Sequence, residues 1–314
     1  MKLSRTSKFR LISINSLFAI TLLPCILLIG FNAHALPEQA LVPGGLALLK
    51  LPDYTEGTEV TFKNKRVAIF PYRDTWIAMA GIGLSTKPGD YEFLIKQTDK
   101  ETIKTKFTIE YKKYDEQHLT IKNKRKVNPN KQDGERIASE STRKRNARQR
   151  YSKTDPNVDF IWPVTGRISS IFGLRRFFNE QERRPHSGLD IAAKEGTPIK
   201  AVANGTVIDT GDFFFSGNMI YIDHGQGIIS LYAHLSKISV KPGDIINQGD
   251  IIGNVGQTGR VTGPHLHFAI YANQTLIDPA FMLPVDGNPP ITLSSENTAD
   301  SEEKTEINPP KTNK

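Results

Sequence analysis

Frequent turn signals divide the second half of this chain into short segments, and this pattern constrains the fold more than any other feature. The turns combine glycine with Asn, Asp, Gln or Pro, and they lie at 204–205, 217–218, 225–227, 242–244 and 249–250. Short apolar segments separated by such turns are typical of antiparallel β-sheets. We therefore predict an antiparallel all-β domain over residues 158–284.

A second, smaller β domain is predicted over residues 36–110. Tyr, Phe and Ile alternate with other residues in 91–95, and Ile, Thr, Phe and Ile alternate with polar residues in 103–109, as expected for strands with one buried face. The tripeptide at 63–65 (KNK) predicts a hairpin turn that leads into a strand at 66–70. Because this region carries no cluster of candidate catalytic groups, we interpret it as a sandwich-like accessory domain.

Length and composition agree with two globular domains. The chain has 314 residues, about twice the length of a typical domain. Hydrophobic residues make up 38% and charged residues 24%, which excludes a fibrous or wholly disordered chain. The single cysteine, Cys25, excludes an internal disulfide framework and a cysteine-rich zinc module. Residues 285–314 are rich in Pro, Ser, Thr, Asn and Glu, and we predict a disordered tail there.

The first 35 residues have the pattern of an export signal. Basic residues near the N-terminus are followed by an apolar run at 11–31 and by Ala33-His34-Ala35, a small-x-small cleavage pattern. We predict a signal peptide over residues 1–35, export through the secretory pathway and a periplasmic location. The alternative is an uncleaved inner-membrane anchor, because the apolar run is long enough to span a bilayer.

A basic segment joins the two predicted domains. Residues 111–153 contain 14 Lys and Arg residues against 5 Asp and Glu residues. We predict a linker over residues 111–157 whose part at 131–150 forms a solvated helix that has few large apolar side chains and packs on one edge only. We therefore expect a chain that starts near Asp155 to fold alone.

The charge of this segment has a functional alternative, a transient contact with an anionic envelope surface through residues 111–153. Nucleic acid is not an expected partner, because no aromatic side chain lies among the basic ones at 131–150.

Five of the seven histidines lie between positions 186 and 267, and the first belongs to residues 186–190 (HSGLD). His186 and Asp190 can converge on one metal ion if Gly188 lets the chain turn. Both are good zinc ligands. Alone, this spacing is a weak signal.

A second element is formed by residues 264–268 (PHLHF). Residues two apart on a strand point to the same face, so His265 and His267 lie opposite the apolar Leu266 and Phe268. Two imidazoles side by side on an open strand face suit one metal ligand and one neighbouring acid or base.

The third element is His234, in residues 229–235 (ISLYAHL). Alternation assigns Ile229, Leu231 and Ala233 to the core, which places His234 on the other face. Together the three elements supply three metal ligands and spare acid or base groups within about 80 residues. Metal-assisted hydrolysis needs such a set, with a fourth metal position for water.

These elements resemble the motifs of lysostaphin/LytM-type zinc endopeptidases, in the form of secreted Gram-negative members. The resemblance also includes residues 169–173 (SSIFG) with Arg175, residues 217–225 and residues 258–268. It covers residues 158 to about 284, and the combination of motifs is highly specific.

The resemblance implies a fold, a cofactor and residue roles. His186, Asp190 and His267 are expected to bind one zinc ion per chain. His234 and His265 are expected to be the catalytic histidines, with the roles of base and oxyanion partner left open between them. The family hydrolyses peptide bonds in peptidoglycan, so the expected function is a peptidoglycan endopeptidase with peptidoglycan as partner.

Two other functions fit the same fold class. One is a catalytically silent member that activates a separate cell-wall amidase, and the other is a wall-binding module. Silent members lack ligands, whereas all five expected site residues are present here. The sequence leaves the cleaved cross-link and the oligomeric state open. It also leaves open whether residues 36–153 limit access to the site, or instead bind the cell wall or space the enzyme from the membrane.

Overall fold

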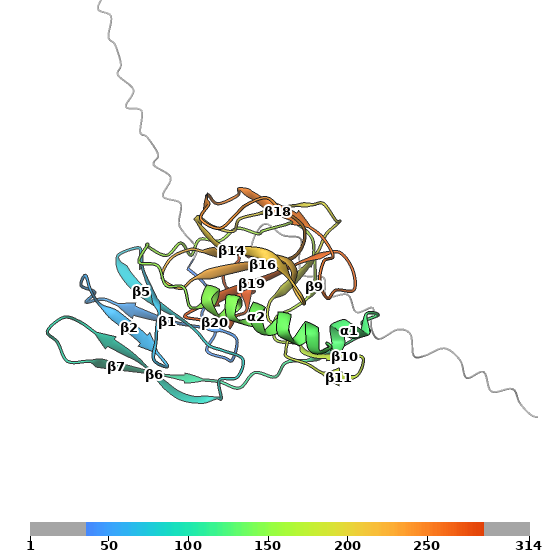
Figure 1. The fold of residues 1–314 in the computed structure, drawn as a ribbon. Coiled ribbons are helices and arrows are strands. Elements are labelled where there is room, and N and C mark those ends of the chain that lie inside the picture. The colour runs from blue at the N-terminus through green and yellow to red at the C-terminus, as the bar shows by residue number, and fades with distance from the viewer. Residues whose placement is uncertain (1–35, 286–314) are drawn as a thin grey trace, which may run out of the picture. The chain divides into compact units, whose positions relative to one another are not determined.

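The computed structural model describes residues 36–285. The predicted export signal and residues 286–314 of the predicted tail lie outside the described residues. Within the part of the chain that is described, no helix is both long and apolar enough to cross a membrane. All described residues belong to one unit, whose regular structure is mainly β-strand (Figure 1).

Residues 46–109 form two antiparallel sheets. One sheet has the order β1-β5-β4 and the other the order β3-β2-β6-β7. The strands are β1 (Leu46–Leu51), β2 (Glu59–Phe62), β3 (Lys65–Arg66), β4 (Ala68–Tyr72), β5 (Thr75–Gly81), β6 (Gly89–Lys96) and β7 (Ile103–Ile109). Both sheets contribute to one apolar cluster, which includes Phe62 and Phe93 from one and Ala78 and Ala80 from the other. The predicted sandwich-like domain is therefore present.

The predicted hairpin forms, but the strand after it is shorter than expected. Lys63 and Asn64 adopt left-handed φ angles of 50° and 60°, which suits the tight turn between β2 and β3. The strand expected at 66–70 divides at Val67. Its first part pairs with β2, and its second part, β4, crosses to pair with β5 in the other sheet.

The three-stranded sheet is buried on both faces. In β5, Ala78 and Ala80 face the sandwich core, whereas Ile77 and Met79 belong to a cluster that continues into the second half of the chain. Side chains from residues 46–80 and from 160–283 thus share one core.

The segment between the domains contains one strand and two helices, β8 (Glu116–Leu119), α1 (Lys124–Val127) and α2 (Lys131–Arg148). Strand β8 pairs in parallel with β10 (Arg175–Phe178), which also pairs with β11 (Gln181–Glu182). Asn130 caps α2 by accepting from Asp133 N–H, while the Asp133 carboxylate accepts from the Asn130 N–H. The predicted helical linker is confirmed.

The second half is built on a ten-stranded antiparallel sheet with the main order β17-β14-β15-β16-β19-β12-β9. Its strands are β9 (Arg167–Ser170), β12 (Leu189–Ala192), β13 (Pro198–Lys200), β14 (Gly205–Phe213), β15 (Gly217–Asp223), β16 (Ile229–Ile238), β17 (Ile245–Ile246), β18 (Ile251–Val255), β19 (His265–Ala272) and β20 (Thr275–Ile277), and a short 3₁₀ helix follows at Pro279–Phe281. The predicted all-β fold is confirmed. Helix α2 lies against β14 (Figure 1).

Candidate metal centre

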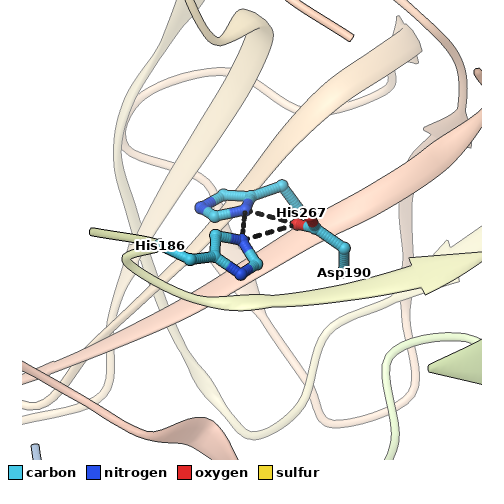
Figure 2. A group of neighbouring side chains, drawn as sticks. All are labelled: His186, Asp190 and His267. Carbon is cyan, nitrogen blue, oxygen red and sulfur yellow. Dashed lines mark hydrogen bonds and ion pairs between the residues drawn. The ribbon is translucent and has the colours of Figure 1, made fainter. Parts of the chain in front are cut away.

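Strands β12 and β19 pair side by side and bring three polar side chains to one point. Asp190 of β12 is directly opposite His267 of β19, and His267 Nδ1 lies 2.7 Å from Asp190 Oδ1. His186 precedes β12, and its Nε2 lies 2.9 Å from Asp190 Oδ1 and 3.1 Å from His267 Nδ1. Figure 2 shows these atoms facing one another. The three predicted metal ligands therefore offer two nitrogens and one oxygen, all within 4.8 Å of one another.

Gly188 allows this convergence by its small size. A Cβ atom at this position would lie 2.3 Å from the Phe268 carbonyl oxygen and 2.9 Å from His267 Cε1. The expected reason for a glycine here was a turn. The structure instead shows that the chain between His186 and Asp190 passes so close to β19 that no side chain fits.

Neighbouring groups orient two of the three ligands. His186 Nδ1 lies 2.7 Å from the Ile171 carbonyl oxygen, so this nitrogen carries the proton and Nε2 presents its lone pair to the converging point. Arg176 Nη2 donates to Asp190 Oδ2 at 2.7 Å, which leaves Oδ1 to face the two imidazoles. Arg175, which belongs to the motifs of the resemblance, pairs with Glu116 and Glu182.

His265 and His234 lie beside this group. The rings of His234 and His265 are 4.9 Å apart, and those of His234 and His267 are 5.8 Å apart. His265 Nδ1 lies 2.9 Å from the Gly263 carbonyl oxygen, and His234 Nδ1 lies 2.8 Å from that of Thr258. Both rings therefore donate from Nδ1 and keep an unprotonated Nε2 when neutral. All five predicted site residues are gathered in one place.

His234 reaches the site by a route that alternation did not predict. In β16, Ala233 is opposite His267, whereas Tyr232 is opposite Phe268 in the core. Ile229, Leu231 and Ala233 are buried in an apolar cluster, as predicted. This cluster is on the same face as His267, so alternation alone would place His234 on the face away from the site.

A β-bulge in β16 turns the His234 side chain towards the site. Ile220 of β15 pairs with Tyr232 and Asn218 pairs with Leu235, so one residue of β15 is opposite two of β16. His234 adopts a left-handed φ of 68° at this irregularity, and its N–H donates to the Ser216 carbonyl oxygen. Without the bulge, its side chain would point into the core with Tyr232.

Burial and mutual contacts set the protonation states. Burial lowers the pKa of His234 well below its usual range, and His265 and His267 lower it further. Burial also lowers the pKa of His267. Burial acts to raise the pKa of Asp190, but the charges and hydrogen bonds of His186 and His267 outweigh it and hold that pKa well below its usual value. Neutral imidazoles and an ionised carboxylate are the forms that bind a metal.

A cavity of about 590 Å³ adjoins these side chains. His186, His234 and His267 contribute to its wall, and α2 contributes Lys144 and Arg148. The basic helix therefore borders the site, a position that its charge pattern alone did not predict.

The other histidines of the described chain serve different surroundings. His224 is buried, with Nδ1 2.7 Å from the Asn204 carbonyl oxygen and Nε2 2.7 Å from Ser230 Oγ. His118 lies on β8 and pairs with Glu180. Neither belongs to the converging group.

Comparisons with known proteins agree with this geometry. Residues 184–279 match peptidase family M23, and residues 39–112 match the peptidase family M23 N-terminal domain. The crystal structure of a protein assigned to peptidase M23 from Pseudomonas aeruginosa is 36% identical, with a TM-score of 0.66. The similarity covers 80% of this chain and 96% of the Pseudomonas chain.

Curated proteins are also similar to parts of this chain. The peptidoglycan DD-endopeptidase ShyA of Vibrio cholerae is 41% identical over 140 residues, 44% of this chain and 30% of that protein. The DD-carboxypeptidase/endopeptidase Mpg of Neisseria meningitidis is 43% identical over 116 residues, 37% of this chain and 27% of that protein. The matches thus span less than a third of each relative. With its two family segments and its match to nearly the whole Pseudomonas protein, the chain belongs to peptidase family M23.

Proposed function

We propose that this protein is a zinc-dependent endopeptidase that hydrolyses peptide cross-links of peptidoglycan. The observation that carries the proposal is the convergence of His186 Nε2, Asp190 Oδ1 and His267 Nδ1 beside two further histidines. Supporting it, the similar proteins from Vibrio and Neisseria are named as endopeptidases.

The donor set fits zinc. Two imidazole nitrogens and one carboxylate oxygen are the ligand types that catalytic zinc takes, with a position left open. His186 Nε2 and His267 Nδ1 lie 3.1 Å apart, next to a carboxylate. A cation bound between them would accept the lone pairs of both nitrogens, which otherwise point at each other. Zinc held there would act as a Lewis acid that polarises a peptide carbonyl and lowers the pKa of a water molecule.

The neighbouring histidines would carry the proton transfers. His265 and His234 each donate from Nδ1 to a backbone carbonyl oxygen, so each offers Nε2 as a proton acceptor. The pair can take the proton of the attacking water and return it to the leaving amine, or donate to the oxyanion once protonated. Arg176 would hold Asp190 in its ligating orientation by the bond to Oδ2.

This function would require the protein to meet the cell wall. We therefore retain the proposals that residues 1–35 direct export through the secretory pathway and that the protein acts in the periplasm. Fractionation of cells that carry the full chain, with mass spectrometry of the mature N-terminus, would test export and distinguish a cleaved signal from an anchor.

The decisive experiment measures metal content and products together. The purified protein should contain one zinc per chain, and mass spectrometry of muropeptides should show peptide cross-links cut. The absence of released peptides, together with stimulation of an amidase, would instead support the silent activator.

Variants of the five site residues test the roles. His186→Ala, Asp190→Ala and His267→Ala should each lose zinc. His234→Ala and His265→Ala should keep zinc and lose about 10²–10⁴-fold in rate. His118→Ala, outside the site, is the matched control. Stoichiometric zinc in the His186 variant, or loss of zinc in the His234 variant, would reverse the assignment.

A further inference from the structure

Apart from histidines, the charged side chains of the described residues that line the cavity beside the metal centre are all basic. Its wall contains no Asp or Glu side chain, and its six basic residues come from α2 and from the catalytic half: Lys144, Arg145, Arg148, Arg176, Arg184 and Arg260. Arg176 is already paired with Asp190. The remaining cations face a space of about 590 Å³ that also borders His234 and His267.

Arg260 is held in a fixed orientation. Its guanidinium lies 4.4 Å from the ring centres of both Phe178 and Phe215, and Nη1 donates to the Lys126 carbonyl oxygen. Among the described residues, no carboxylate lies within ion-pair distance of it. Burial lowers the pKa of Arg260 to about 10, and the charges of Arg176 and Arg183 lower it further. The planar Arg260 guanidinium is thus held at the cavity without a paired carboxylate among the described residues, and its N–H groups can donate in one plane.

Lys144 approaches the same cavity from α2. Its Nζ donates to Ser216 Oγ at 3.1 Å. Burial lowers the pKa of Lys144 and Arg260 acts in the same direction, whereas the charge of Glu140 acts to raise it. The neighbouring Arg143 points elsewhere and pairs with Asp209. On α2, Arg143 is therefore paired with a carboxylate of the sheet, whereas the next residue, Lys144, lines the cavity.

We propose that Arg260 and Lys144 form a subsite that binds a free carboxylate of the peptide substrate, close to the bond that is cleaved. The proposal rests on the endopeptidase function above and adds a substrate feature to it. A carboxylate would accept from the guanidinium fork of Arg260 and from Nζ of Lys144, and it would relieve the repulsion between these cations. Because the two residues come from different parts of the chain, the linker helix would take part in specificity.

The test compares two soluble cross-linked muropeptides that differ only in whether their free carboxylates are converted to amides. The wild-type zinc enzyme should cleave the acid form with a kcat/KM about 10- to 100-fold higher. Lys144→Gln and Arg260→Gln should lose this preference and retain cleavage of the amide form, whereas Lys144→Arg should keep part of the preference. Lys131→Gln removes the same charge from the exposed start of α2 and should behave as wild type.

Equal kcat/KM for the two peptides in the wild type, or an unchanged preference in both Gln variants, would overturn the subsite. If neither peptide is cleaved, the proposed function fails, and calorimetry still tests the subsite on the metal-free protein. In that case tighter binding of the acid peptide, lost in Lys144→Gln and kept in Lys131→Gln, supports the subsite. Equal binding of both peptides overturns it.

Discussion

At the scale of single residues, the site depends on a glycine that carries no chemistry. Gly188→Ala would place a methyl group 2.3 Å from the Phe268 carbonyl oxygen and against the His267 ring. We expect zinc affinity to fall about 10- to 100-fold, as when other supports of a ligand are lost, with a stability loss of about 1–3 kcal/mol. Zinc titration and thermal melting measure the two effects. Gly134→Ala, where nothing lies within 4 Å, is the control. Equal zinc affinity in both variants would contradict the explanation.

A buried histidine outside the site predicts a dependence of stability on pH. Burial lowers the pKa of His224 from 6.5 to about 4, so only the unfolded chain gains this proton between those values. The unfolding free energy should be highest above pH 6.5 and should decrease as pH falls from 6.5 towards 4. Urea unfolding in metal-free buffer should show a smaller pH slope for His224→Gln than for the wild type. Identical slopes would assign the dependence to other groups.

The sequence predicted which residues form the site better than it predicted how they reach it. The spacing to His186 made Asp190 a candidate ligand, and the family resemblance chose His267 over His265. The bulge at His234 was not predicted, because a left-handed φ at a histidine has no sequence signature comparable to a glycine. The contact of Arg176 with Asp190 was not predicted, because it depends on how β10 is placed beside β12 and no motif spacing indicates this.

At the scale of elements, α2 is attached to the ten-stranded sheet by polar contacts. The buried Glu140 carboxylate accepts from the Phe214 N–H at 2.9 Å and from Arg136 Nε at 2.6 Å. Arg143 pairs with Asp209, and Ala147 is buried in the cluster over β15 and β16. The predicted helix exists. Its sequence did not reveal this attachment, because the contacts use charged residues that usually remain in solvent.

Glu140→Ala should therefore destabilise the protein. The change leaves the Phe214 N–H without its buried acceptor, which costs about 1–3 kcal/mol. Thermal melting should show a midpoint several degrees lower than the wild type. Glu135→Ala alters an exposed residue of the same helix and should leave the midpoint nearly unchanged. Equal midpoints for the two variants would show that α2 is not held by this contact.

At the scale of the whole molecule, the N-terminal sheets and the catalytic sheet are joined through a common core. Asn273 Oδ1 accepts from the Gly81 N–H at 2.5 Å, and Gln226 Oε1 accepts from the Ile69 N–H at 2.9 Å. The apolar run at 76–82 carried the signal for burial on both faces of β5. Alternation in the other strands indicated only one buried face, so the sequence predicted two separate domains.

This shared core changes what is expected of a chain that starts at Asp155. Such a chain would expose the apolar side chains that contact Phe70, Ile77 and Met79, and it would lose Glu140 and Lys144. We expect a lower melting midpoint than the full mature chain, and a lower kcat/KM per zinc-loaded molecule on the acid muropeptide. Near-UV circular dichroism would establish which fraction is folded before rates are compared. A higher rate for the truncated chain would show that α2 blocks the cavity beside the metal centre and does not contribute to substrate binding there. An unchanged midpoint would show that the second domain is stable without the first.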